Sequence, residues 1–115
     1  MDQHQAIAAL GALAQETRLA LFRLLVTCGP EGMAAGAIAE RLGVAPSSLS
    51  FHLQELVHAG LIRQRRSSRN LIYSAEYATM NELLVYLTEN CCGRGAVCAP
   101  LCNPEDAPAE EKANE

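Results

Sequence analysis

Apolar residues recur at helical spacing near the start of the chain. From Gln3 to Ala14, the positions of Ile7, Leu10 and Leu13 predict a first helix. The polar face of this helix is thin, so we expect it to pack on more than one partner.

The next segment, ETRLALFRLLVTC, has apolar residues around most of a helix circumference. This pattern is typical of a central core helix, with Arg18 and Arg23 left pointing outward. Gly29, Pro30 and Gly32 follow directly, and these residues are expected to end the helix.

Two further helices are predicted before the middle of the chain. The first runs from about Ala34 to Leu42 with Gly43 as its terminator, and the second begins at Pro46, a residue type tolerated in a first helical turn. A rotation of about 100° per residue separates an apolar stripe on this second helix from a polar, nearly uncharged face. The stripe holds Leu49, Leu53, Leu56 and Val57, and the opposite face holds Ser47, Phe51, Gln54 and His58. An uncharged polar face is unusual for a helix that meets only solvent.

The helical pattern changes after Ala59 and Gly60 to the alternation of LIRQRRSSRNLIYSAE. Two alternating runs flank residues 67–70, which predicts a two-stranded hairpin. A last helix is expected over residues 77–90, with Gly93 at its end.

The resulting order of elements, ααααββα, is that of a winged helix-turn-helix domain. We therefore expect a mainly α fold with a two-stranded β-wing over residues 1–92, which suits one domain in a chain of 115 residues. In such domains a recognition helix presents its outer face to the DNA major groove, while the basic hairpin reaches the neighbouring backbone or minor groove.

The charge distribution supports a nucleic-acid partner although the net charge is -4. Residues 104–115 hold five acids and one Lys, so the eight acids and eight bases of residues 1–103 cancel. We expect residues 103–115 to form a disordered acidic tail. The stretch from Leu56 to Ala75 contains no acid, and its bases are Arg63, Arg65, Arg66 and Arg69. The predicted wing is therefore locally basic.

Cysteines mark a second region of interest. The chain begins with Asp2 where a secretory signal would be basic, and no apolar run approaches the roughly 20 residues that span a bilayer, so we expect a cytoplasmic bacterial protein without a membrane partner. In that reducing compartment clustered thiols are ligands or redox sensors more often than structural disulfides. Four of the five cysteines lie in residues 91–102: Cys91, Cys92, Cys98 and Cys102. The fifth, Cys28, is interpreted as a buried small hydrophobe.

The segment AIAERLGVAPSSLSFHLQELVHAGLI resembles the ArsR/SmtB family of metal-responsive bacterial repressors. The resemblance covers about residues 6–92 and is carried by Ser50-x-His52-Leu53, Leu56 and Ala59-Gly60-Leu61-Ile62. It implies a homodimer whose first and last helices form the subunit interface. It also implies a repressor that binds double-stranded operator DNA when metal-free.

Carried over position by position, the resemblance assigns a DNA-reading role to two groups of residues. Ser47, Ser48, Ser50, Phe51 and Gln54 would face the groove, and Arg65, Arg66 and Arg69 would contact DNA from the wing. Arg63 is either a further wing contact or a solvated strand residue. His52 is expected to pack and hydrogen-bond rather than bind metal. The alternative is that the serines are helix caps in a solvated helix and the arginines keep an edge strand soluble.

The metal sites of familiar family members do not match this sequence. Arsenic-sensing members carry Cys-x-Cys near the third helix, where this chain has Ala34 and Gly36, and zinc-sensing members use acidic and histidine ligands on a last helix that here has neither Asp nor His. The pattern Cys91-Cys92-x5-Cys98 instead resembles a variant class of arsenite repressors. Arsenite can exchange three hydroxyls for three thiolates, so these cysteines suffice for one As(III) per subunit. The resemblance thus implies a repressor released from DNA by arsenite.

Other inducers remain open at this cysteine-rich segment, residues 91–102. Antimonite and cadmium are also soft and thiol-seeking. With Cys102 as a fourth ligand the segment could hold zinc, cadmium or lead in an all-thiolate site, and the same thiols could sense redox state. No organic cofactor is expected. An enzyme is the rival class, but no Cys is followed six positions later by Arg and no glycine pattern resembles a nucleotide cradle.

Overall fold

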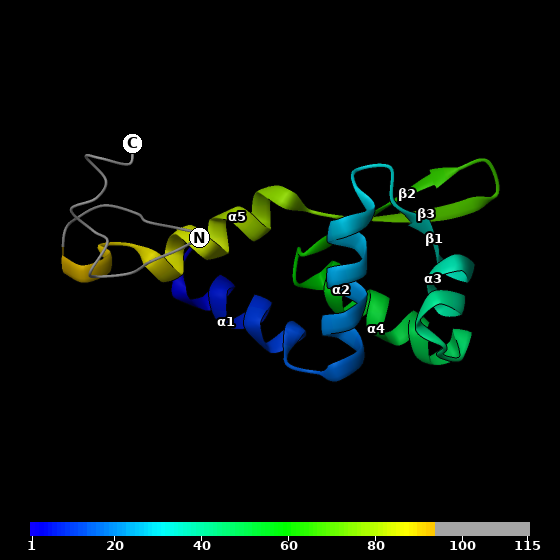
Figure 1. Cartoon of the computed structure of the whole chain (residues 1–115), viewed down its shortest axis with the longest axis horizontal. Helices are drawn as coiled ribbons and strands as arrows, with labels where there is room; N and C mark the ends of the chain where they lie inside the picture. Colours follow the sequence, from blue (N-terminus) through cyan, green and yellow to red (C-terminus); the bar gives the residue numbers. More distant parts are fainter. Residues whose placement is uncertain (94–115) are drawn as a thin grey trace.

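The computed structural model describes residues 1–93, and these form five α-helices and a small antiparallel sheet (Figure 1). The elements in chain order are α1 (Gln3–Leu13), α2 (Glu16–Cys28), β1 (Met33–Ala34), α3 (Ala35–Leu42), α4 (Pro46–His58), β2 (Ile62–Ser67), β3 (Asn70–Ala75), α5 (Tyr77–Thr88) and the 3-10 turn η1 (Cys91–Gly93). The predicted winged helix-turn-helix class is therefore confirmed. The predictions for residues 94–115, including Cys98, Cys102 and the acidic tail, lie outside the described residues.

The core forms where α2 packs against α1, α3, α4 and β3. Its largest fully buried side chains are Leu21, Leu25, Ile38, Leu49, Leu56 and Leu61. The α4 residues among them belong to the predicted apolar stripe, so the interpretation of α4 as amphipathic is confirmed. Each fully buried leucine contributes about 1.5–3 kcal/mol of transfer free energy to stability.

The helices begin and end at identifiable local contacts. Asp2 caps α1 with a capping box, in which the Gln5 backbone N–H donates to Asp2 Oδ1 and the Asp2 N–H donates to Gln5 Oε1, both at 2.8 Å. Gly43 ends α3 in the left-handed region with φ 68°, as predicted. The predicted end of α5 is wrong, because the helix ends at Thr88 and Gly93 lies in η1.

The sheet has a third strand that the sequence pattern did not predict. β1 pairs antiparallel with β3, giving the order β1-β3-β2. A strand of two residues is too short to show an alternating pattern, which explains why it was missed. The wing hairpin of β2 and β3 turns at Ser68, a non-glycine residue with φ 60°.

Helices α1 and α5 lie beside each other at the end of the molecule opposite the tip of the wing (Figure 1). α1 buries the small residues Ala6, Ala9 and Ala12, while Ile7 and Leu10 remain 59% and 43% exposed. The helical spacing of Ile7 and Leu10 therefore predicted the helix correctly, but these two side chains lie on its exposed face and not in the core. On α5 three large apolar residues are also exposed: Leu84, Val85 and Leu87.

The interface between α5 and α2 includes a hydrogen bond. The Tyr77 hydroxyl donates to the carbonyl oxygen of Val26 at 2.9 Å. Val26 lies in the last turn of α2, where helix carbonyls lack partners within the helix. The bond therefore fixes the start of α5 to the core.

Candidate nucleic-acid interface

The outer face of α4 is exposed along its whole length. Its exposed members are Ser47, Ser48, Ser50, Phe51 and Gln54, all of which were predicted to read DNA. Neither serine of the first turn acts as the helix cap, because the N-cap is Ala45 and no side chain caps the helix. The alternative interpretation of these serines as caps is therefore wrong. The hydroxyl and amide groups remain available to base edges or phosphates.

Phe51 and His52 form an edge-to-face aromatic pair on α4. Their ring centroids are 5.6 Å apart with an interplanar angle of 63°. Phe51 is 58% exposed, which is unusual for a large apolar side chain in the middle of a helix and fits contact with a thymine methyl group. His52 is half-buried, and Nη1 of Arg18 lies 3.2 Å from its Nδ1. The expectation that His52 packs and hydrogen-bonds is confirmed.

The prediction for Arg18 is wrong. It was expected to point outward from α2, yet its Nε donates to the Ala12 carbonyl oxygen at 2.6 Å and its guanidinium reaches α4. Ala12 belongs to α1 and His52 to α4, so the hydrophobic spacing within α2 carried no signal for these contacts.

The wing arginines fall into two pairs with different surroundings. Arg63 lies 3.4 Å from the Glu76 carboxylate, and Arg65 donates to the Glu31 carbonyl oxygen at 2.8 Å. Arg66 and Arg69 are exposed and make no hydrogen bond or ion pair with any residue of 1–93. Arg63 and Arg65 also share one face of β2, while Arg66 lies on the other. Among residues 1–93, the arginines nearest the turn are therefore the ones without a hydrogen-bond or ion-pair partner.

The described part of the cysteine-rich segment lies directly after α5. Cys91 Sγ and Cys92 Sγ are 3.4 Å apart in η1, where Cys92 has a left-handed backbone with φ 60°. Cys92 carries a free thiol, whereas Cys91 forms a disulfide. Within residues 1–93 no group of three or more His, Cys, Asp or Glu side chains could hold a metal ion. The predicted three-cysteine site includes Cys98 and so is only partly covered by the described residues.

Cys28 is exposed, so its interpretation as a buried hydrophobe is wrong. It is the last residue of α2, and its Sγ contacts the Gly32 carbonyl oxygen at 3.3 Å. Its position at the helix end places it beside the following turn rather than in the core. It lies on a different element from η1 and is not part of the cysteine pair.

Comparison with known proteins shows to which family the chain belongs. A family model described as a helix-turn-helix domain matches residues 13–65. The nodulation protein NolR of Rhizobium meliloti is 33% identical over 88 residues, which are 76% of this chain and 70% of NolR. The homodimeric winged helix-turn-helix DNA-binding domain of Mb0332 from Mycobacterium bovis, a possible ArsR-family transcriptional regulator, is 29% identical with a TM-score of 0.60, over 73% of this chain and 77% of that one. The chain belongs to this ArsR-type family of winged helix-turn-helix transcriptional regulators.

A third relative of the ArsR-type regulator is the reduced form of HlyU from Vibrio cholerae. It is 32% identical with a TM-score of 0.56, and the match covers 73% of this chain and 88% of HlyU. As a member of this family of transcriptional regulators, the chain is not an enzyme. No helix among residues 1–93 is long and apolar enough to cross a membrane.

Proposed function

We propose that this ArsR-type regulator is a homodimeric repressor that binds operator DNA when metal-free and leaves it when arsenite or antimonite binds Cys91, Cys92 and Cys98. The observation that carries the proposal is the separation of two surfaces within one small domain. An exposed polar face of α4 and an arginine-tipped wing would serve DNA, whereas the cysteine pair follows α5, the helix that contacts α1. The first surface would read DNA and the second would sense the inducer.

Dimerisation through α1 and α5 is supported by their exposed apolar side chains. Ile7 and Leu10 on α1 and Leu87 on α5 are each more than 40% exposed, although isolated domains bury most residues of this kind. The related Mb0332 domain is homodimeric. A two-fold dimer would place two copies of α4 about one DNA turn, roughly 34 Å, apart on a pseudo-palindromic operator.

The cysteine pair fits a thiophilic ion. Two sulfurs bound to one ion at about 2.3 Å each can lie no further apart than about 4.6 Å, and Cys91 Sγ and Cys92 Sγ are 3.4 Å apart. When bound, arsenite would supply a trivalent centre with three bonds to sulfur. Cys98 is our candidate for the third thiolate, and Cys102 for an additional ligand. Because the disulfide at Cys91 removes one thiolate, the site forms only in the reduced protein.

The proposed coupling runs through α5. Drawing the segment after Gly93 onto the end of α5 would alter how α5 packs on α1 and on the second subunit. That change would alter the spacing of the two α4 helices. To lower operator occupancy a hundredfold, the ligand must favour the non-binding state by about 2.7 kcal/mol, a normal size for coupling between two sites.

A titration tests this proposal directly. The fully reduced protein is titrated with arsenite and separately with zinc, and free thiols and bound element are measured per subunit for the parent and for Cys98→Ser. Loss of about three thiols per arsenic, abolished by Cys98→Ser, is the result expected from a three-thiolate site. Consumption of four thiols by zinc, with arsenite bound no better than by a simple dithiol, would reject arsenite as the inducer.

Redox control is the second candidate function, because Cys91 forms a disulfide and its neighbour Cys92 is a free thiol in this structure. HlyU, a relative, has been solved in a form specified as reduced. A redox repressor would release operator DNA on oxidation in the absence of any metalloid. Operator binding measured with and without a mild oxidant, in metal-free buffer, separates the two candidates.

A further inference from the structure

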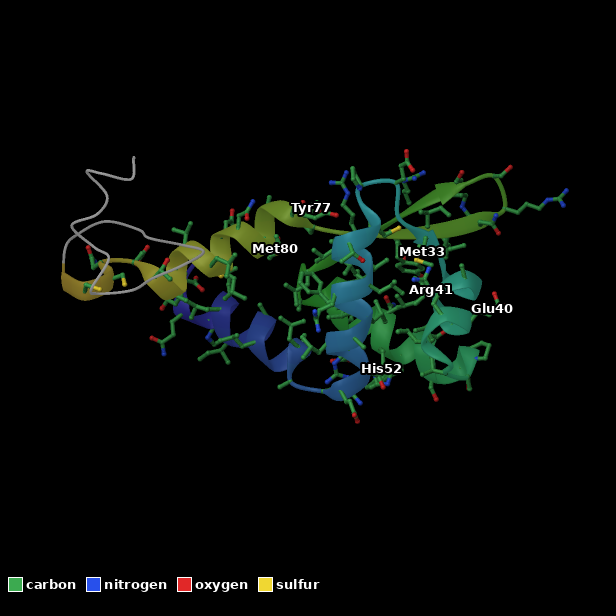
Figure 2. All side chains as sticks on the ribbon, viewed as in Figure 1. Met33, Glu40, Arg41, His52, Tyr77 and Met80 are labelled. Carbon is green, nitrogen blue, oxygen red and sulfur yellow. The ribbon has the colours of Figure 1, made fainter. Side chains whose placement is uncertain are left out.

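The Arg18 side chain joins three helices at the corner between α1 and α2. Its Nε donates to the Ala12 carbonyl oxygen of α1 at 2.6 Å, and its Nη1 lies 3.2 Å from Nδ1 of His52 on α4. Both contacts are part-buried. The backbone N–H of Arg18 is held in turn by Gln15 Oε1 at 2.8 Å, the cap of α2. Figure 2 shows His52 beside this N-terminal end of α2. Arg18 is thus fixed at both ends.

The chemistry of the two groups determines the direction of the Arg18–His52 bond. A guanidinium has five donors and no acceptor, so Nδ1 of His52 is the acceptor in this bond. Ala12 lies in the last turn of α1, where carbonyls lack partners within the helix. Each bond from Arg18 therefore satisfies a polar group that its own helix leaves unpaired.

We propose that Arg18 and His52 form a positioning pair that sets the orientation of α4 relative to α1. This inference rests on the proposed DNA-reading role of α4. His52 lies between the base-reading candidates of α4, two positions after Ser50 and two before Gln54, and its ring meets that of Phe51 edge to face. A His52 ring that is held in place therefore also holds the exposed polar face of α4 and the Phe51 side chain in place.

A positioning role has a consequence that a general stabilising role lacks. Phosphate contacts from the wing require only that positive charge lies near the backbone, whereas hydrogen bonds to base edges require α4 at the correct depth and angle. Loss of the pair should therefore weaken binding to a preferred sequence while leaving binding to unrelated DNA almost unchanged. The ratio of the two affinities is the quantity to measure.

The experiment begins with a preferred duplex selected from random sequences by the reduced parent protein. Affinity for this duplex and for an unrelated duplex of the same length is then measured at one salt concentration for the parent, His52→Asn, His52→Leu and Arg18→Lys. The Asn Oδ1 can accept where Nδ1 does, Leu fills space without an acceptor, and Lys lacks the planar fork that serves two acceptors.

We expect His52→Leu and Arg18→Lys to lower the affinity ratio about tenfold or more, the size of one lost base contact, with less than about a twofold change on unrelated DNA. His52→Asn should retain most of the parent ratio. Thermal unfolding of each variant identifies any loss of fold, and if His52→Leu does not fold, Arg18→Lys decides by the same ratio.

Two results would overturn the positioning pair. One is a parent-like ratio in both His52→Leu and Arg18→Lys. The other is an equal loss in His52→Asn and His52→Leu, because the acceptor at Nδ1 would then have no special importance. In both cases the parent still selects a sequence, so the DNA-reading role of α4 survives. If the parent selects no sequence at all, that role and the positioning pair are both rejected.

Discussion

Gly32 passes so close to Tyr73 that the main chain leaves no room for a side chain between them. A Cβ on Gly32 would overlap the carbonyl oxygen of Tyr73, and Gly32 has φ +75°, which L side chains rarely adopt. The neighbouring Met33 pairs with Tyr73 in the short β1–β3 ladder. The close approach therefore joins the turn after α2 to the wing.

The first prediction follows from this contact. Gly32→Ala should lower the free energy of unfolding by about 1–3 kcal/mol from its φ alone, with a further loss from the overlap. Gly36→Ala is the matched control, because Gly36 lies on helix α3 with nothing near its Cβ position. That control should gain about 0.5–1 kcal/mol. Urea denaturation at equal protein concentration measures both, and equal stability of the two variants would contradict the prediction.

The helices, the hairpin and their order were predictable because each leaves a periodic pattern over many residues. The apolar stripe of Leu49, Leu53 and Leu56 is buried as expected, and Pro46 and Gly43 lie at the helix boundaries that their backbone preferences favour. The backbone preferences of individual residues and the burial of apolar side chains therefore favour the same elements over most of residues 1–93.

The predictions that failed concern contacts between different helices and strands. Arg18 points inward because Ala12 and His52 offer acceptors, and β1 exists because β3 passes beside it. Neither of these contacts produces a periodic pattern in the sequence. Of the candidate site, the polar face of α4 and the basic wing were predictable, whereas the division of the wing arginines was not. Arg63 and Arg65 have Glu76 and Glu31 as partners, and both of these residues lie outside β2.

This division of the wing arginines yields the second prediction. Arg69 has no hydrogen-bond or ion-pair partner among residues 1–93. Arg69→Gln should therefore weaken binding to all duplexes about equally and reduce the salt dependence of log affinity by about 1, as expected for one lost phosphate contact. Arg63→Gln is the control, because its guanidinium already lies beside Glu76. Binding measured across a series of salt concentrations gives both slopes. Identical slopes for the two variants would refute the distinction.

The third prediction concerns the exposed apolar faces of α1 and α5. Leu87→Glu should shift the protein from dimer to monomer, because a carboxylate buried in an apolar interface without a partner costs several kcal/mol. Ala37→Glu, on the exposed side of α3 away from α1 and α5, should leave the dimer intact. Sedimentation velocity over a range of concentrations measures the mass. A dimer of unchanged affinity in Leu87→Glu would move the interface away from α5.

The fourth prediction separates sensing from DNA binding. Cys92→Ser removes a thiolate but keeps a similar shape, so repression of a reporter should persist while induction by arsenite is lost. Cys28→Ser is the matched control, because Cys28 is also an exposed free thiol but lies on α2 rather than after α5. This control should repress and respond like the parent. If Cys92→Ser instead fails to repress without arsenite, the cysteine pair supports the fold, and the proposal that it acts as a switch is wrong.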